Sequence, residues 1–281
     1  MSNGSAESQH EAPESSLLVP FEIENIPAEY REYYRAKRSN FFASIQNFPE
    51  LWKYYLQLDG IWMREFDDLK PPRDPNRSFP LILFFNAHAK MRISIELAFS
   101  GCLQEARSIL RDAIEYVAHA HRMLSDPALQ LVWLGKLDGT VEAKAFQDAF
   151  LHCKKENLFV GLDELHEKWR ELSETGSHAT PLAICDRFVI ENSEDGGQNW
   201  KLNYSGVESP RRWATSLFTM LLTCFTMERI LFKDHETRLQ FDESLLRMRA
   251  KFEIYKERLR KRLIARYKIP PPRPKSMIHR P

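Results

Sequence analysis

Residues 103–124 read LQEARSILRDAIEYVAHAHRML, and this stretch decides the fold class. Apolar residues recur along it at alternating spacings of three and four, which lines them up on one side of an α-helix. A stripe that runs the whole length of a helix is typical of close packing against a partner helix. Its members are Leu103, Ala106, Leu110, Ala113, Val117, Ala120 and Leu124.

The segment before this stripe, about residues 79–99, supplies the partner helix. It is apolar nearly all round, and Ser100 and Gly101 form a turn between the two segments. We therefore predict a helical hairpin that folds about Gly101. Glycine makes up 10 of the 281 residues, and such a low content also favours helices over sheets. The predicted fold class is all-α.

Helical periodicity, prolines near helix starts and turn residues predict the other elements. We expect one helical-bundle domain over residues 27–268, between a disordered acidic head at 1–26 and a disordered Pro-rich and basic tail at 269–281. A small β-hairpin is expected at about 187–204, because Glu194-Asp195-Gly196-Gly197 is a strong turn signal. The other expected helices span 27–46, 49–69, 127–137, 140–157, 162–176, 210–232 and, as a long C-terminal helix, 236–267.

The formal net charge of +1 conceals an uneven distribution. Residues 1–30 carry six glutamates and no Lys or Arg. Residues 251–281 carry eleven Lys or Arg and two Glu, a net charge of +9. The balance excludes a uniformly basic nucleic-acid-binding protein, but it allows a local basic surface on the last helix.

Several features favour a cytoplasmic protein without a membrane partner. The first residues lack the basic and apolar regions of a signal peptide. The four cysteines form no CxxC pair. Trp213 to Met227 is uncharged, but fifteen helical residues span about 22 Å, less than the roughly 30 Å of a hydrocarbon core. We predict that this stretch is a buried core helix.

Ionisable side chains recur every four residues on both arms of the predicted hairpin. Such groups are costly in an apolar environment unless they pair with each other. A fold about Gly101 brings Glu96 to Arg107. It also brings Arg92 near Arg111 and Glu115, and His88 toward Glu115. The network either fixes helix register or forms a polar ligand pocket, and the sequence leaves both alternatives open. The candidate ligand-binding residues are His88, Arg92, Glu96, Arg107, Arg111, Glu115 and His119.

The segment from Trp169 to His178 holds further candidates. Gly176 is expected to end a helix as its left-handed cap, and His178 follows it, where a cation interacts favourably with the helix dipole. A helix cap and a catalytic group are the two alternatives for this histidine. Ser173, Ser177 and His178 could also converge on the hairpin network.

Two short patterns carry a resemblance to a known family. Residues 106–115 have the form A-x-x-x-L-R-x-x-x-E, and residues 169–178 have the form W-R-x-L-S-x-x-x-S-H. With the hairpin and long helix that follow, they resemble uncharacterised bacterial all-helical proteins that are similar in pattern to HEPN domains, over about residues 80–232. The resemblance implies a helical-bundle core and metal-independent ribonuclease or nucleotide-binding roles in toxin and phage-defence systems. Arg229 and His235 have the spacing of the HEPN Arg–His pair, with Ile230 at the usually polar position.

Other catalytic and metal-binding patterns are absent from the sequence. Glu-x-x-His, which a di-iron bundle needs on two helices, occurs at Glu7 to His10 alone. His119 and His121 lie about 200° apart on a helix and cannot share a metal. The sequence contains no Gly-rich phosphate loop, HExxH or G-x-S-x-G. We therefore expect neither a metal nor a cofactor.

The C-terminal helix has an apolar stripe that includes Leu245, Phe252 and Leu259, and it carries basic residues elsewhere. These either form a solvated face or bind the phosphates of RNA or DNA. The candidate nucleic-acid-binding residues are Arg249, Lys256, Arg260, Lys261 and Arg262.

Two classes of function remain open. The first is an interaction or ligand- and nucleotide-binding module built on the Arg/Glu/His network. The second is a HEPN-like metal-independent ribonuclease in stress response or phage defence, with His178, Arg229 and His235 as catalytic candidates. The candidate partners are RNA or a nucleotide at the basic helix, and a second copy of the chain in a homodimer.

Overall fold

A computed structural model describes residues 26–69, 75–150, 156–177, 188–192, 198–202, 209–236 and 241–268. Residues 1–36 and 37–281 form two separate units, and each is described by itself. Helix α1 (Ala28–Asn47) begins in the first unit and ends in the second. The predicted head, apart from Ile26, and the predicted tail lie outside the described residues.

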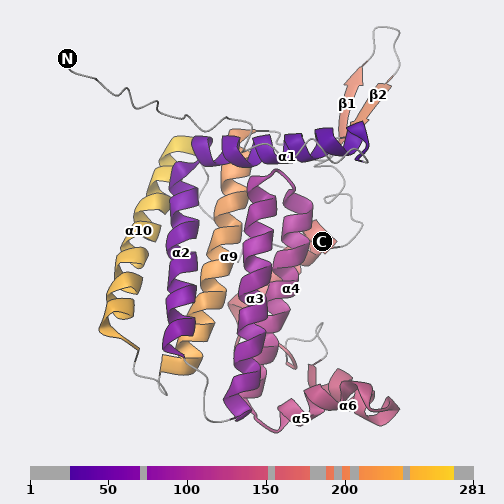
Figure 1. The fold of residues 1–281 in the computed structure, drawn as a ribbon, viewed down its shortest axis with the longest axis vertical. Coiled ribbons are helices and arrows are strands. Elements are labelled where there is room, and N and C mark those ends of the chain that lie inside the picture. Colours follow the sequence, from indigo (N-terminus) through magenta and orange to yellow (C-terminus); the bar gives the residue numbers. More distant parts are fainter. Residues whose placement is uncertain are drawn as a thin grey trace, which may run out of the picture. The chain divides into compact units, whose positions relative to one another are not determined.

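The second unit is a bundle of helices, as the sequence predicted (Figure 1). Its long helices are α2 (Pro49–Asp68), α3 (Pro75–Phe99), α4 (Leu103–Ser125), α9 (Pro210–Glu236) and α10 (Glu243–Tyr267). Shorter pieces connect α4 to α9. They include α5 (Leu129–Leu134), the 3₁₀ turn η2 (Gly135–Leu137), α6 (Thr140–Phe150), α7 (Asp163–Leu172) and the π-helical turn η3 (Ser173–Ser177).

The β-hairpin expected at about 187–204 is present. Strand β1 (Phe188–Asn192) pairs with β2 (Gln198–Leu202) in the antiparallel sense, so that Ile190 faces Trp200. Residues 193–197, which carry the turn signal, lie outside the described residues. The described part of the chain is otherwise helical or irregular, which confirms the all-α class.

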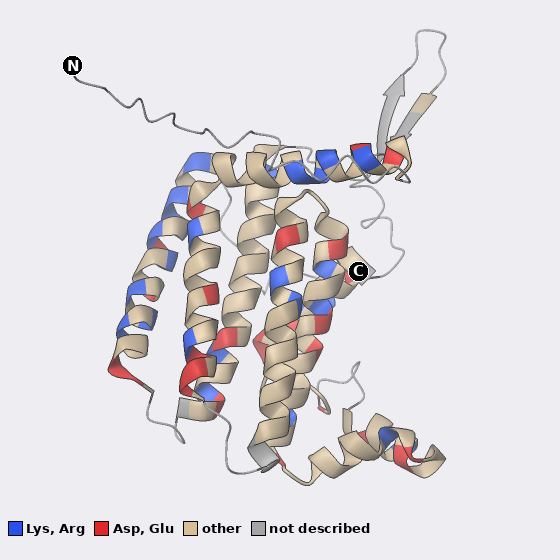
Figure 2. Cartoon of the chain, viewed as in Figure 1, with Lys and Arg blue, Asp and Glu red and all other residues tan. Residues whose placement is uncertain are grey.

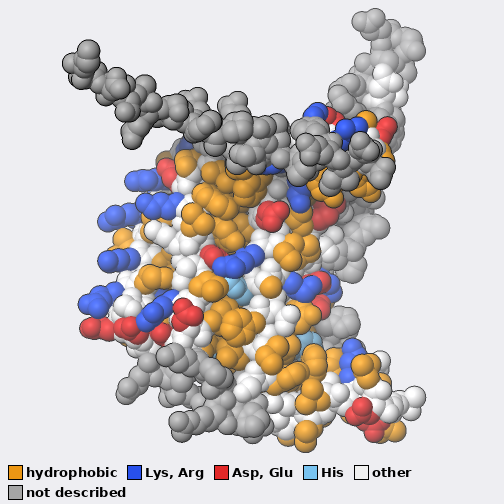
Figure 3. Space-filling view, in the orientation of Figure 1, with side chains coloured by type: hydrophobic (Ala, Val, Ile, Leu, Met, Phe, Trp, Pro, Cys, Tyr) orange, Lys and Arg blue, Asp and Glu red, His pale blue; other side chains and the backbone are white. Residues whose placement is uncertain are grey.

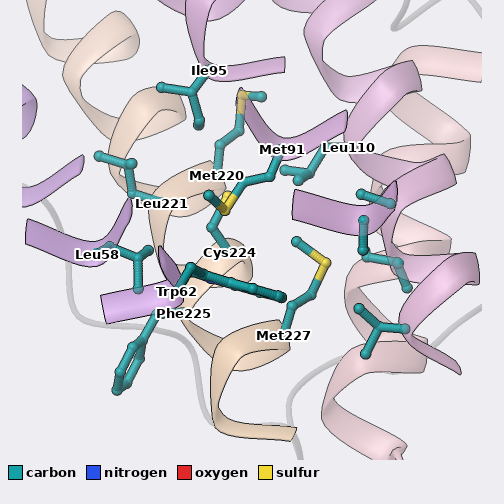
Figure 4. Close-up of a cluster of buried hydrophobic side chains, with 14 of the residues drawn as sticks. Leu58, Trp62, Met91, Ile95, Leu110, Met220, Leu221, Cys224, Phe225 and Met227 are labelled. Atoms are coloured by element: carbon teal, nitrogen blue, oxygen red, sulfur yellow. The ribbon is translucent and has the colours of Figure 1, made fainter. Parts of the chain in front are cut away.

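The α3–α4 hairpin is the centre of the fold, and its apolar stripe is buried as predicted. Apart from the partly exposed Leu103, every member of the stripe is buried. The alanines of α4 let the two backbones approach closely, and the Ser94 hydroxyl of α3 donates a hydrogen bond to the Ala106 carbonyl of α4 (2.7 Å). Residues from α2 and α9, such as Trp62 and Met227, complete the core around Met91 and Leu110 (Figure 4).

Helix α9 contains the uncharged stretch that the sequence assigned to the core. Among the described residues, α9 alone is long and apolar enough to cross a membrane by length and composition. However, 61% of its most apolar window is buried inside the protein. Burial against other helices is what the prediction of a core helix requires.

Several predicted helix boundaries were wrong, since α3 begins at Pro75 and not at 79 and α9 runs to Glu236 and not to 232. The C-terminal helix begins at Glu243 and not at 236, because Asp242 is its N-cap and its carboxylate accepts a hydrogen bond from the Ser244 N–H (2.9 Å). Helix α6 is described as far as Phe150, and residues 156 and 157, which the prediction placed in this helix, lie in a turn. The residues between 150 and 156 lie outside the described chain.

Gly176 plays a different part from the predicted left-handed cap. It lies within the π-helical turn η3, and positive φ angles occur at other glycines, Gly101 and Gly161. A Cβ atom at Gly176 would approach the Arg107 Cβ to 2.7 Å and the Ser108 backbone N to 2.9 Å. Glycine is therefore needed here because η3 presses against the backbone of α4.

We expect Gly176→Ala to lower the free energy of unfolding by about 1–3 kcal/mol, as overpacking does. Gly60→Ala is the matched control, because a Cβ atom there meets Met248 Cε at an ordinary 3.8 Å. Alanine in the middle of α2 should stabilise the helix by up to about 1 kcal/mol. Chemical denaturation of both variants measures the two effects, and equal effects at the two positions would contradict the close η3–α4 contact.

Candidate functional sites

The charged stripe of α3 pairs with α2 and not with α4, contrary to the prediction. Asp59 of α2 accepts hydrogen bonds from His88 Nε2 (2.8 Å) and from Arg92 Nε and Nη2 (2.7 and 2.8 Å). The His88 ring also stacks on Trp62. Burial opposes ionisation of Asp59, but the hydrogen bonds from His88 and Arg92 lower its pKa to about 2.

The predicted pair between Glu96 and Arg107 is also wrong. Glu96 lies 3.7 Å from Lys37, whereas Arg107 donates a hydrogen bond to the Ser216 hydroxyl of α9 (3.3 Å). Both corrections have one cause. The small and apolar residues fill the α3–α4 contact, so the charged stripes of the two helices face outward to different neighbours.

The charged stripe of α4 meets α7, and here the structure brings together the two patterns on which the family resemblance depends. Arg111 forms an ion pair with Glu115 (2.8 Å) and donates a hydrogen bond from Nε to the Ser173 hydroxyl (3.0 Å). The Trp169 indole N–H donates to the same Glu115 carboxylate (2.9 Å). Convergence of Ser173 on the network was predicted. The side chains of Ser177 and His178 lie outside the described residues.

This α4–α7 network braces the bundle. The Arg111 guanidinium lies 5.0 Å from the centre of the Trp169 ring, so its positive charge is met by an aromatic face as well as by Glu115. The hydroxyl of Ser173 in turn donates to the Trp169 carbonyl (2.8 Å). Arg111 and Glu115 of α4 bond to Ser173 and Trp169, so the network fixes the position of α7 against α4.

Glu115 and His119 continue the α4 stripe into a cavity of about 470 Å³, here called the α5–α6 cavity. Helices α3 and α4 form one wall, and α5, η2 and α6 form the other. Aromatic rings are prominent on both walls. The His119 ring stacks on Phe146 of α6, and Trp133 of α5 packs edge to face against Phe79 of α3.

Charged groups also line the α5–α6 cavity. Lys90 pairs with Asp112 (3.2 Å) and lies 5.6 Å from the centre of the Tyr116 ring. Lys136 of η2 is exposed, with its Nζ 4.3 Å from the centre of the Phe146 ring. The cavity therefore combines aromatic rings with ammonium groups that lie over the rings of Tyr116 and Phe146.

A second cavity, of about 350 Å³, lies between α4, α7, α9 and α10, and it is here called the α7–α9 cavity. His121 Nδ1 lies 2.9 and 2.8 Å from the two carboxylate oxygens of Asp234. Arg229, a catalytic candidate from the sequence, lines the same cavity. His235 does not meet Arg229 there, because it lies about 120° away around α9. It is buried with its Nδ1 against the Leu231 carbonyl.

Two of the five predicted nucleic-acid contacts are not free surface groups. Arg249 is largely buried, where it pairs with Glu65 of α2 (2.7 Å) and with Glu228 of α9 and lies over the Phe232 ring (3.6 Å). Lys256 pairs with Glu253 and lies over the Phe225 ring (4.4 Å). Both lie on the flank of α10 that turns toward α9. Arg260, Lys261 and Arg262 are exposed.

The Arg249 cluster places two buried carboxylates against one cation. Glu65 and Glu228 are fully buried, and among the described residues the Oε2 atom of each lacks a hydrogen-bond partner. Burial raises the pKa of Glu65 to about 8, although Arg249 opposes the rise. The cluster is therefore balanced when one of the two carboxyl groups keeps its proton.

Asp59 and Asp234 are two of the site residues that the sequence did not point to. Asp59 is 29 positions from His88, and Asp234 is 113 positions from His121. No local spacing indicates either pair. Each aspartate is a single carboxylate on a predicted helix. It can be recognised as the partner of a histidine only when the packing of the helices is known.

Comparisons of the chain with protein-family models, with curated proteins and with solved structures found no match. The geometry of the two cavities and of α10 is therefore the basis for a function.

The Arg249 cluster predicts a pH-dependent stability. Glu65 loses its proton near its ordinary pKa of 4.5 in the unfolded chain, but near pH 8 in the folded protein. The folded state is therefore progressively destabilised, relative to the unfolded state, as pH rises from about 5 to 8. Glu65→Gln should remove this fall in stability. The melting temperature of the variant, relative to that of the wild type, should therefore rise by several degrees from pH 5 to pH 9.

Asp67→Asn is the control, because Asp67 is the exposed acid two positions along α2. Thermal unfolding, followed by circular dichroism at pH 5, 7 and 9, gives a curve of melting temperature against pH for the wild type and for each variant. Parallel curves for wild type and Glu65→Gln would contradict a protonated Glu65.

Proposed function

We propose that the protein is a ligand-binding helical bundle whose α5–α6 cavity takes a nucleotide-like molecule, a flat aromatic ring joined to a phosphate. The observation that carries the proposal is the convergence of aromatic rings and lysines on one cavity of about 470 Å³. That volume lies within the usual range of small-molecule sites, about 300–1,000 Å³.

The ring of such a ligand has a stacking surface in Trp133 of α5, whereas the Phe146 ring of α6 is stacked on His119 and lies under Lys136. Both rings are held in place, since Trp133 contacts Phe79 and Phe146 contacts His119. Asp112 and Glu115 are hydrogen-bond acceptors for the amino groups of a base. Lys136, which has an exposed side chain, supplies charge for a phosphate.

Isothermal titration of the purified chain with adenosine, AMP and ATP tests this function. We expect AMP to bind at least tenfold more tightly than adenosine, because Lys136 pairs with its phosphate. Lys136→Gln should abolish that difference, and Trp133→Leu should weaken all three ligands by stacking loss of about 1–3 kcal/mol.

Lys144→Gln on the exposed side of α6 is the matched control and should bind as the wild type does. Circular dichroism checks that Trp133→Leu is folded, while Lys136→Gln removes an exposed group and tests the site without disturbing the core. Absence of binding heat with all three ligands, or equal affinities in Lys136→Gln and wild type, would refute the assignment.

A second candidate function is RNA binding by the outward face of α10. Figure 2 shows Lys and Arg along this helix, and in Figure 3 their side chains project from its edge. Lys251, Arg258 and Lys261 are exposed, and no ion pair holds them within the described chain. They follow one side of the helix over about 15 Å, at 1.5 Å per residue. Arg247 and Arg262 extend this side, and their acid partners Glu243 and Glu50 lie 3.5 and 3.7 Å away.

We expect a labelled single-stranded RNA to bind the wild type with steep salt dependence, measured by fluorescence anisotropy from 50 to 300 mM salt. Arg258→Gln combined with Lys261→Gln should lower the affinity and reduce the salt slope by about 1–2. Lys144→Gln combined with Arg170→Gln removes the same charge elsewhere and should leave binding unchanged. An equal loss in both double variants would contradict a specific surface on α10.

The HEPN-like ribonuclease hypothesis is testable with the same samples. Denaturing gels of the RNA after incubation detect cleavage, and Arg229→Ala and His178→Ala identify its residues. His235→Ala removes a side chain that is buried beside Phe84, so a loss of activity in that variant counts only if its melting temperature is unchanged.

A further inference from the structure

The α7–α9 cavity contains a histidine whose orientation is fixed. Both carboxylate oxygens of Asp234 lie within 2.9 Å of His121 Nδ1, which places the proton on that nitrogen. Among the described residues, Nε2 of His121 has no hydrogen-bond partner. The second ring nitrogen is therefore left as an acceptor when the imidazole is neutral and as a donor when it is protonated.

Two cations line the same cavity without carboxylate partners in the described chain. Arg229 and Lys233 are exposed and one helical turn apart on α9. No ion pair joins either of them to the acids that line the cavity from α7, Asp163 and Glu164. A guanidinium and an ammonium on neighbouring turns of one helix form a suitable pair of contacts for an oxyanion.

The other charges around His121 are already engaged. The Thr226 hydroxyl donates to the Glu164 carboxylate (3.1 Å), and Asp163 also has an interaction partner. Arg249, which reaches the cavity from α10, is paired with Glu65 and Glu228. Asp163 and Glu164 stand in the first turn of α7, where the helix dipole favours negative charge. The groups with unused bonding capacity are thus Arg229, Lys233 and Nε2 of His121.

We propose that the α7–α9 cavity is a second ligand site, for the phosphate group of a small phosphorylated molecule, with Arg229 and Lys233 as its cationic contacts and His121 as a proton-dependent donor. Asp234 is a positioning residue, because its carboxylate accepts from Nδ1 and so orients the imidazole. The cavity, at about 350 Å³, is larger than a phosphate ion and leaves room for the organic part of the ligand. The site is independent of the α5–α6 cavity and of α10.

Sulfate and inorganic phosphate are suitable probes, followed by two-dimensional NMR of the isotope-labelled full chain at constant ionic strength. Sulfate keeps its double negative charge from pH 6 to 8, so any change in its affinity reports on the protein. We expect signals of residues 161–165 and 226–234 to shift, with sulfate at least fivefold tighter at pH 6 than at pH 8. Phosphate should shift the same signals.

Three variants locate the site. Arg229→Gln combined with Lys233→Gln should abolish the shifts, and because both side chains are exposed, this variant keeps the fold. His121→Gln should retain weak binding but lose its pH dependence. The double variant Lys144→Gln with Arg170→Gln is the control and should bind as the wild type does. Shifts that persist in Arg229→Gln with Lys233→Gln, or the same affinity at pH 6 and pH 8 in the wild type, would overturn the proposal.

Discussion

The close contact between α3 and α4 is the constraint on which the rest of the structure depends. Alanines at 106, 113 and 120 let the two backbones come close enough for a side chain of α3 to bond to a carbonyl of α4. Such a contact leaves no space for the charged stripes between the helices, and Lys90 and Asp112, which do pair across it, are partly exposed. The ionisable stripes must therefore face away from each other, and each has to find its own partner helix.

That requirement explains the order of the surrounding helices. Helix α2 brings Asp59 to the stripe of α3, and α7 with the turn η3 after it brings Trp169 and Ser173 to the stripe of α4. Each of the two cavities is lined by one histidine of α4. His119 and His121 serve different cavities because two residues along a helix correspond to a rotation of about 200°.

Sequence periodicity predicted the helices and the hairpin because these depend on neighbours within a few positions. The stripe of α4 and the turn near Gly101 are local features, as are the strands that flank residues 193–197. The charge pairs were wrong because a helix has more than one neighbour and spacing within one hairpin does not show which one is met. Arg249 illustrates the same point, since it lies on the edge of an amphipathic pattern and its burial depends on acids from α2 and α9.

The Arg249 cluster also has a consequence for biosynthesis. Glu65 and Glu228 belong to helices that are synthesised before α10, and both carboxylates are fully buried in the finished protein. A nascent chain that has produced α2 and α9 but not yet α10 lacks the cation that pairs with both carboxylates. Stable docking of α2 against α9 should therefore wait until α10 has been synthesised.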